Sequence, residues 1–428
     1  MIPYKRLFFL ILCLPLIVGC WDNIEVEERG FVTGITIDFA NSKSAPPPTS
    51  SEQSENGQQQ SNTQEQLEQN ANVNQQKNED NVLNENNKFK LTQQILNPSS
   101  FSAQQSNNTN SNSKSFRNLT QTGDTIIEMN RDMVKQAGRR TNVTHLNVVL
   151  FSEAVAQEEH LFADLMDIFL REKEMLRSVK IAIAKNSAGD YLNILPENEK
   201  IPSKYLSKVL QNKSNLDIAQ PLTVGNVQSF LLSNRSFIIP YINQVNETTV
   251  NYEGLSVYSG AENKVVGHLV GDEAKGVNLI QTKNQTGTIN TEVDDHDVTF
   301  EILDIDSKIT LKDKNKFPLQ FHITIDVSSG VAEQYGSLDI MDEKNYEKLK
   351  KALEMEIKQI TEHTISILQN DFQADVIGLN KHLYGHYYPL WKSIKDNWEE
   401  GQRYFSKSEV QVTVNVTIEK PGNIIKSH

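Results

Sequence analysis

Two histidines have a spacing that suggests zinc chemistry. His382 and His386 are four residues apart, which places two metal ligands on one face of a helix. Gly385 lies between them and weakens a helix, and no glutamate follows His382 to serve as a general base. We therefore expect ordinary surface or packing histidines at this position.

An acidic cluster is a second candidate for chemistry. The run Asp294-Asp295-His296-Asp297 could bind a cation, but its ligands do not follow the spacing of a calcium-binding EF-hand loop. A solvated acidic turn is the simpler interpretation. The sequence also has no Gly-x-Ser-x-Gly nucleophile motif, no Walker phosphate loop and no Gly-x-Gly-x-x-Gly motif. We expect no catalytic activity, no metal and no cofactor.

Cys20 is the residue with a specific chemical prediction. Lys5 and Arg6 precede an uncharged apolar run over residues 7–18, and Ile17-Val18-Gly19-Cys20 ends it. About a dozen apolar residues are too few to span ~30 Å of hydrocarbon, so the run is typical of a signal peptide. The ending is typical of a bacterial lipobox, in which the thiol receives a diacylglyceryl group and the chain is cut before the cysteine.

The first 19 residues are therefore predicted to be a lipoprotein signal peptide. Cys20 is predicted to be an S-diacylglycerol cysteine, whose new amino terminus can also be acylated, for example by palmitate. The alternative is an ordinary signal peptide cut nearby, which leaves Cys20 as a free thiol or in a disulfide. Trp21, next to Cys20, is expected either to lie at the lipid headgroups or to pack on the first domain. At most about ten residues join Cys20 to the first strand, so that domain lies within ~35 Å of the lipid.

Composition excludes several classes of function. The net charge is −13, which disfavours non-specific binding to nucleic acid or to anionic lipid, because both require a basic surface. There are two cysteines, and Cys13 lies in the apolar run. The mature chain thus keeps Cys20 alone and can form neither an internal disulfide nor a cysteine metal cluster.

The elements that would position any site alternate between strand and helix patterns. Strands are predicted over 31–38, 88–96, 146–151, 179–184, 237–241, 255–258, 265–270, 292–311, 317–327 and 409–418. Helices are predicted over 125–136, 154–170, 272–279 and 344–370, with shorter ones near 206–210, 227–231 and 391–398. This alternation predicts an α+β protein of mixed sheets covered by helices.

A polar insert interrupts this pattern. Between Ser51 and Asn87, 19 of 37 residues are Asn or Gln. Such a segment buries too little apolar surface to offset the entropy lost on ordering, so we predict a disordered insert over about 41–87. A second, shorter tract of Ser, Asn and Gln covers 102–114.

Several motifs resemble those of the Ger(x)C family, the lipoprotein C subunits of spore nutrient germinant receptors. The motifs are Gly19-Cys20-Trp21-Asp22, Glu25 to Val32, Gly34 to Asp38, Gln94 to Pro98, His145 to Val149, Phe169 to Glu174, Gly254 to Tyr258, Val266 to Leu269, and Trp391 to Trp398 followed by the last strand. The long Asn/Gln insert departs from the family pattern and concerns a single connection.

The resemblance implies three α/β domains and no established catalytic activity. On this basis we expect an N-terminal domain over 20–198, a middle domain over 199–285 and a C-terminal domain over 286–428. It also implies a lipid anchor through Cys20 on the outer face of the spore inner membrane, beside two integral-membrane receptor subunits.

Two other classes of protein share some of these features. A solute-binding lipoprotein of an importer would also carry the lipobox, but it usually has two doubly wound lobes. A lipid-anchored metallohydrolase would need a cluster of metal ligands. The sequence does not identify the nutrient or say whether this chain contacts it.

Overall fold

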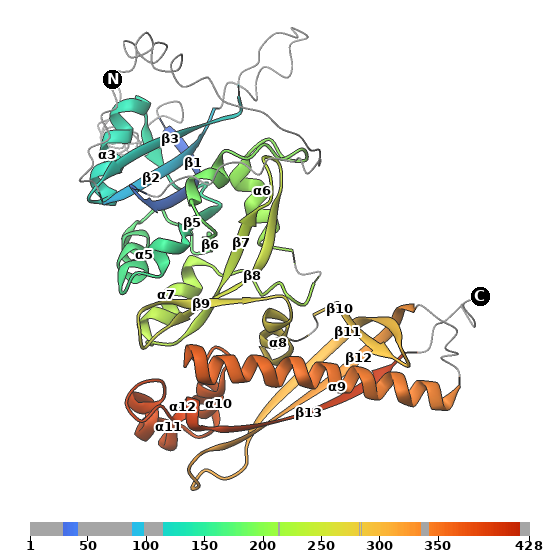
Figure 1. The fold of residues 1–428 in the computed structure, drawn as a ribbon. Coiled ribbons are helices and arrows are strands. Elements are labelled where there is room, and N and C mark those ends of the chain that lie inside the picture. The colour runs from blue at the N-terminus through green and yellow to red at the C-terminus, as the bar shows by residue number, and fades with distance from the viewer. Residues whose placement is uncertain are drawn as a thin grey trace, which may run out of the picture.

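The computed structural model describes residues 29–41, 88–97, 114–212, 215–281, 283, 285–334 and 342–419. The predicted signal peptide, Cys20, Trp21 and nearly all of the Asn/Gln insert lie outside these residues and stay predictions. Two sheets organise the described part of the chain, with the long helix α9 (Glu343–Ile367) lying across the second sheet (Figure 1). The predicted mixed sheets covered by helices are confirmed.

The first sheet has nine strands, with parallel pairing at its centre and antiparallel pairing on both sides. Its order is β3-β2-β1-β5-β6-β7-β8-β9, with β4 beside the start of β1. The strands are β1 (Arg29–Phe39), β2 (Phe89–Leu96), β3 (Phe116–Gly123), β4 (Arg140–Asn142), β5 (Val148–Ser152), β6 (Lys180–Ala184), β7 (Phe237–Gln244), β8 (Val250–Ser259) and β9 (Lys264–Val270).

Helices cover both faces of this sheet, as its buried central strands require. Val149 and Phe151 of β5 pack on one side, where the helices are α3 (Ile126–Ala137), α4 (Glu153–Ala156), α5 (Leu161–Arg171) and α7 (Val224–Leu232). Val148 and Leu150 pack on the other, against the 3₁₀ helix η4 (Ala188–Leu192) and α6 (Pro202–Val209).

The helix predicted over 154–170 is wrong as a single element. The structure has the two helices α4 and α5, separated by a turn in which His160 is left-handed with φ of 63°. The intervening Gln157-Glu158-Glu159-His160 contains no apolar side chain to bury. The N–H of His160 instead donates to the carbonyl of Asn263, 2.9 Å away, which turns the chain toward the β8–β9 hairpin.

Strand β3 was missed by the sequence patterns. It begins just after the polar tract over 102–114, and only Phe116 and Leu119 within it are large and apolar. All eight of its residues pair with β2, and no other strand among the described residues pairs with it, so it is an edge of the sheet. A half-exposed edge strand lacks the apolar run from which buried strands are predicted.

The second sheet has four strands in the order β10-β11-β12-β13. They are β10 (Gly287–Val293), β11 (His296–Leu311), β12 (Gln320–Gln334) and β13 (Glu409–Ile418). The stretch predicted as strand from 292 is divided, because Asp294 and Asp295 have positive φ and form a hairpin turn between β10 and β11.

Helix α9 covers one face of this sheet through its predicted apolar stripe. Leu349, Leu353, Ile357 and Ile360 are buried, and Asp342 caps the first turn by accepting from two backbone N–H groups. Helix α8 (Asp272–Gln281) packs beside α9. The chain ends its described part with α10 (Leu379–His386), α11 (Tyr388–Ile394), η6 (Lys395–Asn397), α12 (Tyr404–Lys407) and β13.

The two sheets share one apolar core. Leu255 and Leu269 of the β8–β9 hairpin belong to the same cluster as Phe321 of β12 and Leu353 of α9. Within the first sheet, β7, β8 and β9 are connected to the other strands by a short ladder. It consists of Ile183 and Ala184 of β6, which pair with β7. The three predicted domain ranges stay predictions.

Candidate functional site

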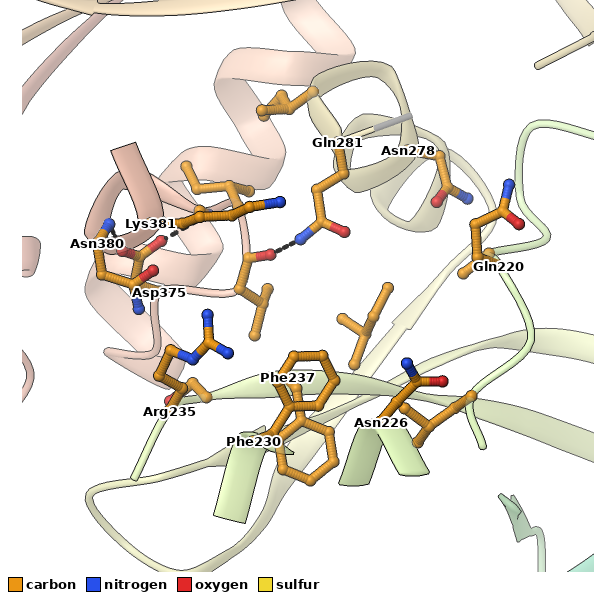
Figure 2. Close-up of a pocket in the computed structure, with 18 of the residues that line it drawn as sticks. Gln220, Asn226, Phe230, Arg235, Phe237, Asn278, Gln281, Asp375, Asn380 and Lys381 are labelled. Carbon is orange, nitrogen blue, oxygen red and sulfur yellow. Dashed lines mark hydrogen bonds between the residues drawn. The ribbon is translucent and has the colours of Figure 1, made fainter. Parts of the chain in front are cut away.

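A pocket of about 390 Å³ lies where the two sheets meet. Its walls come from the 219–222 loop with α7, the start of β7, helix α8, and the 375–381 segment that leads into α10 (Figure 2). Because these segments are far apart in the sequence, the pocket exists only in the folded chain.

Aromatic rings and a guanidinium line one side of the pocket. The rings of Phe230 and Phe237 stack with centroids 5.0 Å apart, and the guanidinium of Arg235 lies 5.3 Å from the Phe230 centroid. Lys381 is exposed, and its side chain points toward Gln281 on the opposite side in Figure 2. The stacked rings give an apolar floor, and the guanidinium of Arg235 adds a positive charge beside it.

Amide groups line the other side. Asn278 donates from its side chain to the carbonyl of Leu216 at 2.6 Å, and Gln281 donates to the carbonyl of Val376. Gln220 and Asn226, both exposed, line the pocket on the side of the 219–222 loop and α7 (Figure 2). Rings, amides and cations are the features of a site that binds a small polar molecule.

One wall depends on the buried carboxylate of Asp375. One of its oxygens accepts from the backbone N–H groups of Gly378 and Leu379 at 2.9 and 3.1 Å. The other accepts from the N–H of Asn380 at 2.6 Å and from the indole N–H of Trp398 at 2.9 Å. Burial raises the pKa of Asp375 and these donors oppose the shift. With four donors satisfied, this carboxylate holds the start of α10 in place and has no lone pair to offer a ligand.

Glu399 joins this wall to the first sheet. Its carboxylate accepts from the N–H of Asp375 at 2.7 Å and from the hydroxyl of Ser236 at 2.5 Å, and Ser236 in turn accepts from the N–H of Gly260 at 2.9 Å. Burial raises the pKa of Glu399 to about 7, and the charge of Asp375 adds to the shift. A titratable contact therefore links the β7–β8 region to the C-terminal helices.

A second polar network lies inside the first sheet. Ser256 is 2.9 Å from Nδ1 of His268, Nε2 of His268 is 3.0 Å from the carboxylate of Glu153, and Tyr241 donates to the same carboxylate at 3.0 Å. The Tyr241 and His268 rings stack with centroids 4.0 Å apart. A serine, a histidine and a carboxylate in contact resemble a hydrolase triad, but Ser256 is 0% exposed and no substrate can reach its hydroxyl. The network instead ties β8 and β9 to α4.

The sequence hinted at this network without locating it. Ser256 and His268 lie in two of the motifs that carry the family resemblance, and the β8–β9 hairpin places them directly opposite each other. Glu153 was not singled out, because its partner His268 is 115 residues away along the chain.

The candidate metal residues are not among those that line the pocket. The rings of His382 and His386 stack on α10 with centroids 4.6 Å apart, and burial lowers the pKa of His382. Asp294 pairs with Lys348 of α9 at 2.5 Å in the β10–β11 turn. Within the described ranges, no three His, Cys, Asp or Glu side chains are grouped so that they could hold a metal ion. Among the same residues, no helix is both long enough and apolar enough to cross a membrane.

Together, two sheets that share one core and a pocket at their junction define an α+β protein. Two family profiles match it: "Spore germination protein N-terminal domain" over residues 79–244 and "Spore germination B3/ GerAC like, C-terminal" over 253–422. The chain belongs to this GerAC-like family of spore germination proteins.

Curated relatives match over almost the whole length. Spore germination protein YndF of Bacillus subtilis (strain 168) is 27% identical over 97% of this chain and 96% of its own. Spore germination proteins B3 and A3 of the same organism are 23% and 25% identical, each over 98% of their own length and over 99% and 97% of this chain.

A solved structure supports the fold. The crystal structure of the GerBC protein superposes with a TM-score of 0.55 at 20% identity, covering 78% of this chain and 94% of that chain. At this level of identity the likeness concerns the fold alone.

Proposed function

We propose that this chain is the lipid-anchored subunit of a nutrient germinant receptor and is required for spore germination. The observation that carries the proposal is that both halves of the chain match spore germination families and that spore germination proteins align over its length. The anchor is Cys20, and the body lies on the outer face of the spore inner membrane. Two integral-membrane subunits are its partners.

The chain acts by association and not by turnover. The strongest arrangement of catalytic residue types, Ser256 with His268 and Glu153, is closed to substrate, and Asp375 is saturated by four donors. A short tether from Cys20 confines the body near the membrane, which raises its effective concentration for a membrane partner. A modest interface then suffices for assembly.

The importer alternative fits the structure less well. A solute-binding lipoprotein has two doubly wound lobes, whereas the second sheet here pairs antiparallel except between β12 and β13 and has a single long helix across it.

The anchor is tested by Cys20→Ala. Two acyl chains at ~0.8 kcal/mol per buried methylene hold a protein stably on a bilayer, whereas one holds it only marginally. We expect Cys20→Ala to accumulate as precursor or to leave the membrane fraction. Wild-type partitioning into the detergent phase would contradict the lipobox.

The receptor role is tested by germination of spores. A strain without this chain should lose its response to one set of nutrients while still germinating with receptor-independent triggers. A long Gly/Ser linker inserted after Asn23 should weaken the response at an unchanged protein level, because it removes the confinement. A normal nutrient response in the null strain, with no paralogous receptor present, would defeat the assignment.

A further inference from the structure

Strand β13 is an edge strand of the second sheet with a free side. Its neighbour β12 lies on one side, and no strand in the described part of the chain lies on the other. From Val410 to Ile418 it contains no charged residue, no proline and no glycine, and its pairing with β12 has no bulge. Proteins usually protect such edges with lysine, proline or a bulge, because a free edge accepts another strand.

The other outer strands carry such protection. β9 contains Lys264, and its pairing with β8 has a register shift. β3 contains Arg117, and β10 contains both Gly287 and Glu292. β13 is thus the outer strand best suited to pairing with a further strand.

The backbone groups that face the open side are those of the even-numbered residues. Glu409 and Glu419 donate their N–H groups to Leu319 and Ser329 beside β12, so the odd-numbered residues face inward. Because backbone groups alternate in direction along a strand, the N–H and C=O groups of Val410, Val412 and Val414 point toward the open side. None of these three N–H groups has a hydrogen-bond partner among the described residues.

The side chains of Gln369 and Glu354 cap the two ends of this open run. The carbonyl of Ser408 accepts from the side chain of Gln369 at 2.8 Å, and the N–H of Val416 donates to Glu354 at 3.1 Å. Both capped groups are four residues from Val412, one on either side. The open run is therefore symmetric about Val412.

We propose that β13 pairs antiparallel with β13 of a second copy of this chain, with Val412 opposite Val412 of that copy. In this register Val410 faces Val414 of the second copy, and each such pair exchanges two hydrogen bonds. The capped Ser408 and Val416 of opposite copies then face each other, which ends the ladder at both sides.

The side chains agree with this register. On the outer face, Gln411 lies opposite Thr413 of the second copy and Glu409 lies opposite Asn415, so no like charges meet. On the inner face the valines of both strands continue the apolar layer beneath α9, where Val412, Val414 and Val416 are already buried. The two four-stranded sheets become one continuous sheet. This dimer goes beyond the proposed receptor role and does not depend on it.

A disulfide test reads the register directly. Gln411→Cys with Thr413→Cys places thiols opposite each other in a non-hydrogen-bonded pair, where the Cα atoms lie about 4.5 Å apart. We expect the full chain with both substitutions, as cells make it, to give a covalent dimer under mild oxidation. The matched control, Gln411→Cys with Thr417→Cys, is out of register and should give only the background seen with the wild-type chain. Equal cross-linking in the two variants, or covalent attachment to another protein in place of a dimer, would overturn the proposal.

Charge reversal tests the association without oxidation. Gln411→Lys with Thr413→Lys places a lysine at 411 opposite a lysine at 413 of the second copy, twice in each dimer. Gln411→Lys with Thr413→Glu places a lysine opposite a glutamate at the same two places. All these positions are exposed in the single chain. We expect the Lys/Lys variant to raise the dissociation constant by about tenfold and the Lys/Glu variant to restore it, measured by sedimentation equilibrium. A wild-type chain that stays monomeric, or a dimer that both variants leave unchanged, would overturn the proposal.

Discussion

The two sheets of this protein bury their strands in different ways. In the first sheet all five residues of β5 are buried, because helices cover both faces. In the second sheet β13 alternates between buried and exposed residues, because α9 covers one face and the other meets solvent. The first sheet therefore tolerates few substitutions at any position of a central strand, whereas the second tolerates them at every other position.

The largest predicted effect breaks the first sheet. Phe151→Ala should lower the free energy of unfolding by about 3–5 kcal/mol, because it removes a fully buried ring between Phe162 and Phe169. Leu150→Ala, on the opposite face of the same strand, should also cost about 2–5 kcal/mol. Urea denaturation measures both. A neutral result at either position would show that one face of β5 is not packed as described.

The next effect lies at the junction of the two sheets. Asp375→Ala leaves four N–H donors without their carboxylate and should cost about 3 kcal/mol. Lys381→Gln, an exposed position on the same wall, is the control and should change stability by less than about 0.5 kcal/mol. Equal effects of the two substitutions in thermal unfolding would argue against a structural role for the buried carboxylate.

The junction should also respond to pH through Glu399. Its pKa is raised from 4.5 to about 7 in the folded chain, so the folded state holds this proton more tightly than the unfolded state does. The stability from Glu399 is then fully present below about pH 4.5 and is lost as pH rises through about 7. After allowance for partial solvent contact, the loss is of the order of 1–2 kcal/mol.

Glu399→Gln isolates this effect from the titration of other groups. It should match the wild type in melting temperature at low pH and exceed it at pH 8, since the amide is never charged. Glu400→Gln, at the exposed neighbouring residue, should follow the wild-type profile. A Glu399→Gln profile that keeps the wild-type decline would assign that decline to other groups.

The smallest effect sharpens the contrast within the second sheet. Thr417→Ala, on the exposed face of β13, should change stability by less than about 0.5 kcal/mol. Val416→Ala, on the buried face one residue earlier, should cost about 1.5–3 kcal/mol. Similar values for the pair would mean that the outer face of the sheet is covered in solution.

The sequence predicted elements best where apolar residues repeat with a clear period. The stripe of α9 from Leu349 to Ile360 and the alternation of β13 both predict their elements, because each buries one side against a single layer. It failed at β3, whose polar residues pair at an edge, and at His160, where a contact with Asn263 turns the chain between α4 and α5.

The candidate sites divide in the same way. The sequence alone determined the predicted lipidation at Cys20 and the charge that disfavours nucleic acid, because short motifs and composition carry that information. It could not place the pocket at the junction, because the pocket's walls come from segments scattered between residues 219 and 381.

The sequence by itself thus determined most of the local elements, since backbone preference and apolar periodicity act over a few residues, and its short motifs carried the resemblance to the family. Only the tertiary structure decided which polar groups meet. Ser236 and Glu399 are 163 residues apart and share a hydrogen bond, and Glu153 reaches His268 across 115 residues. The path of the chain through both sheets brings these groups together, and burial there decides their pairing and their charge.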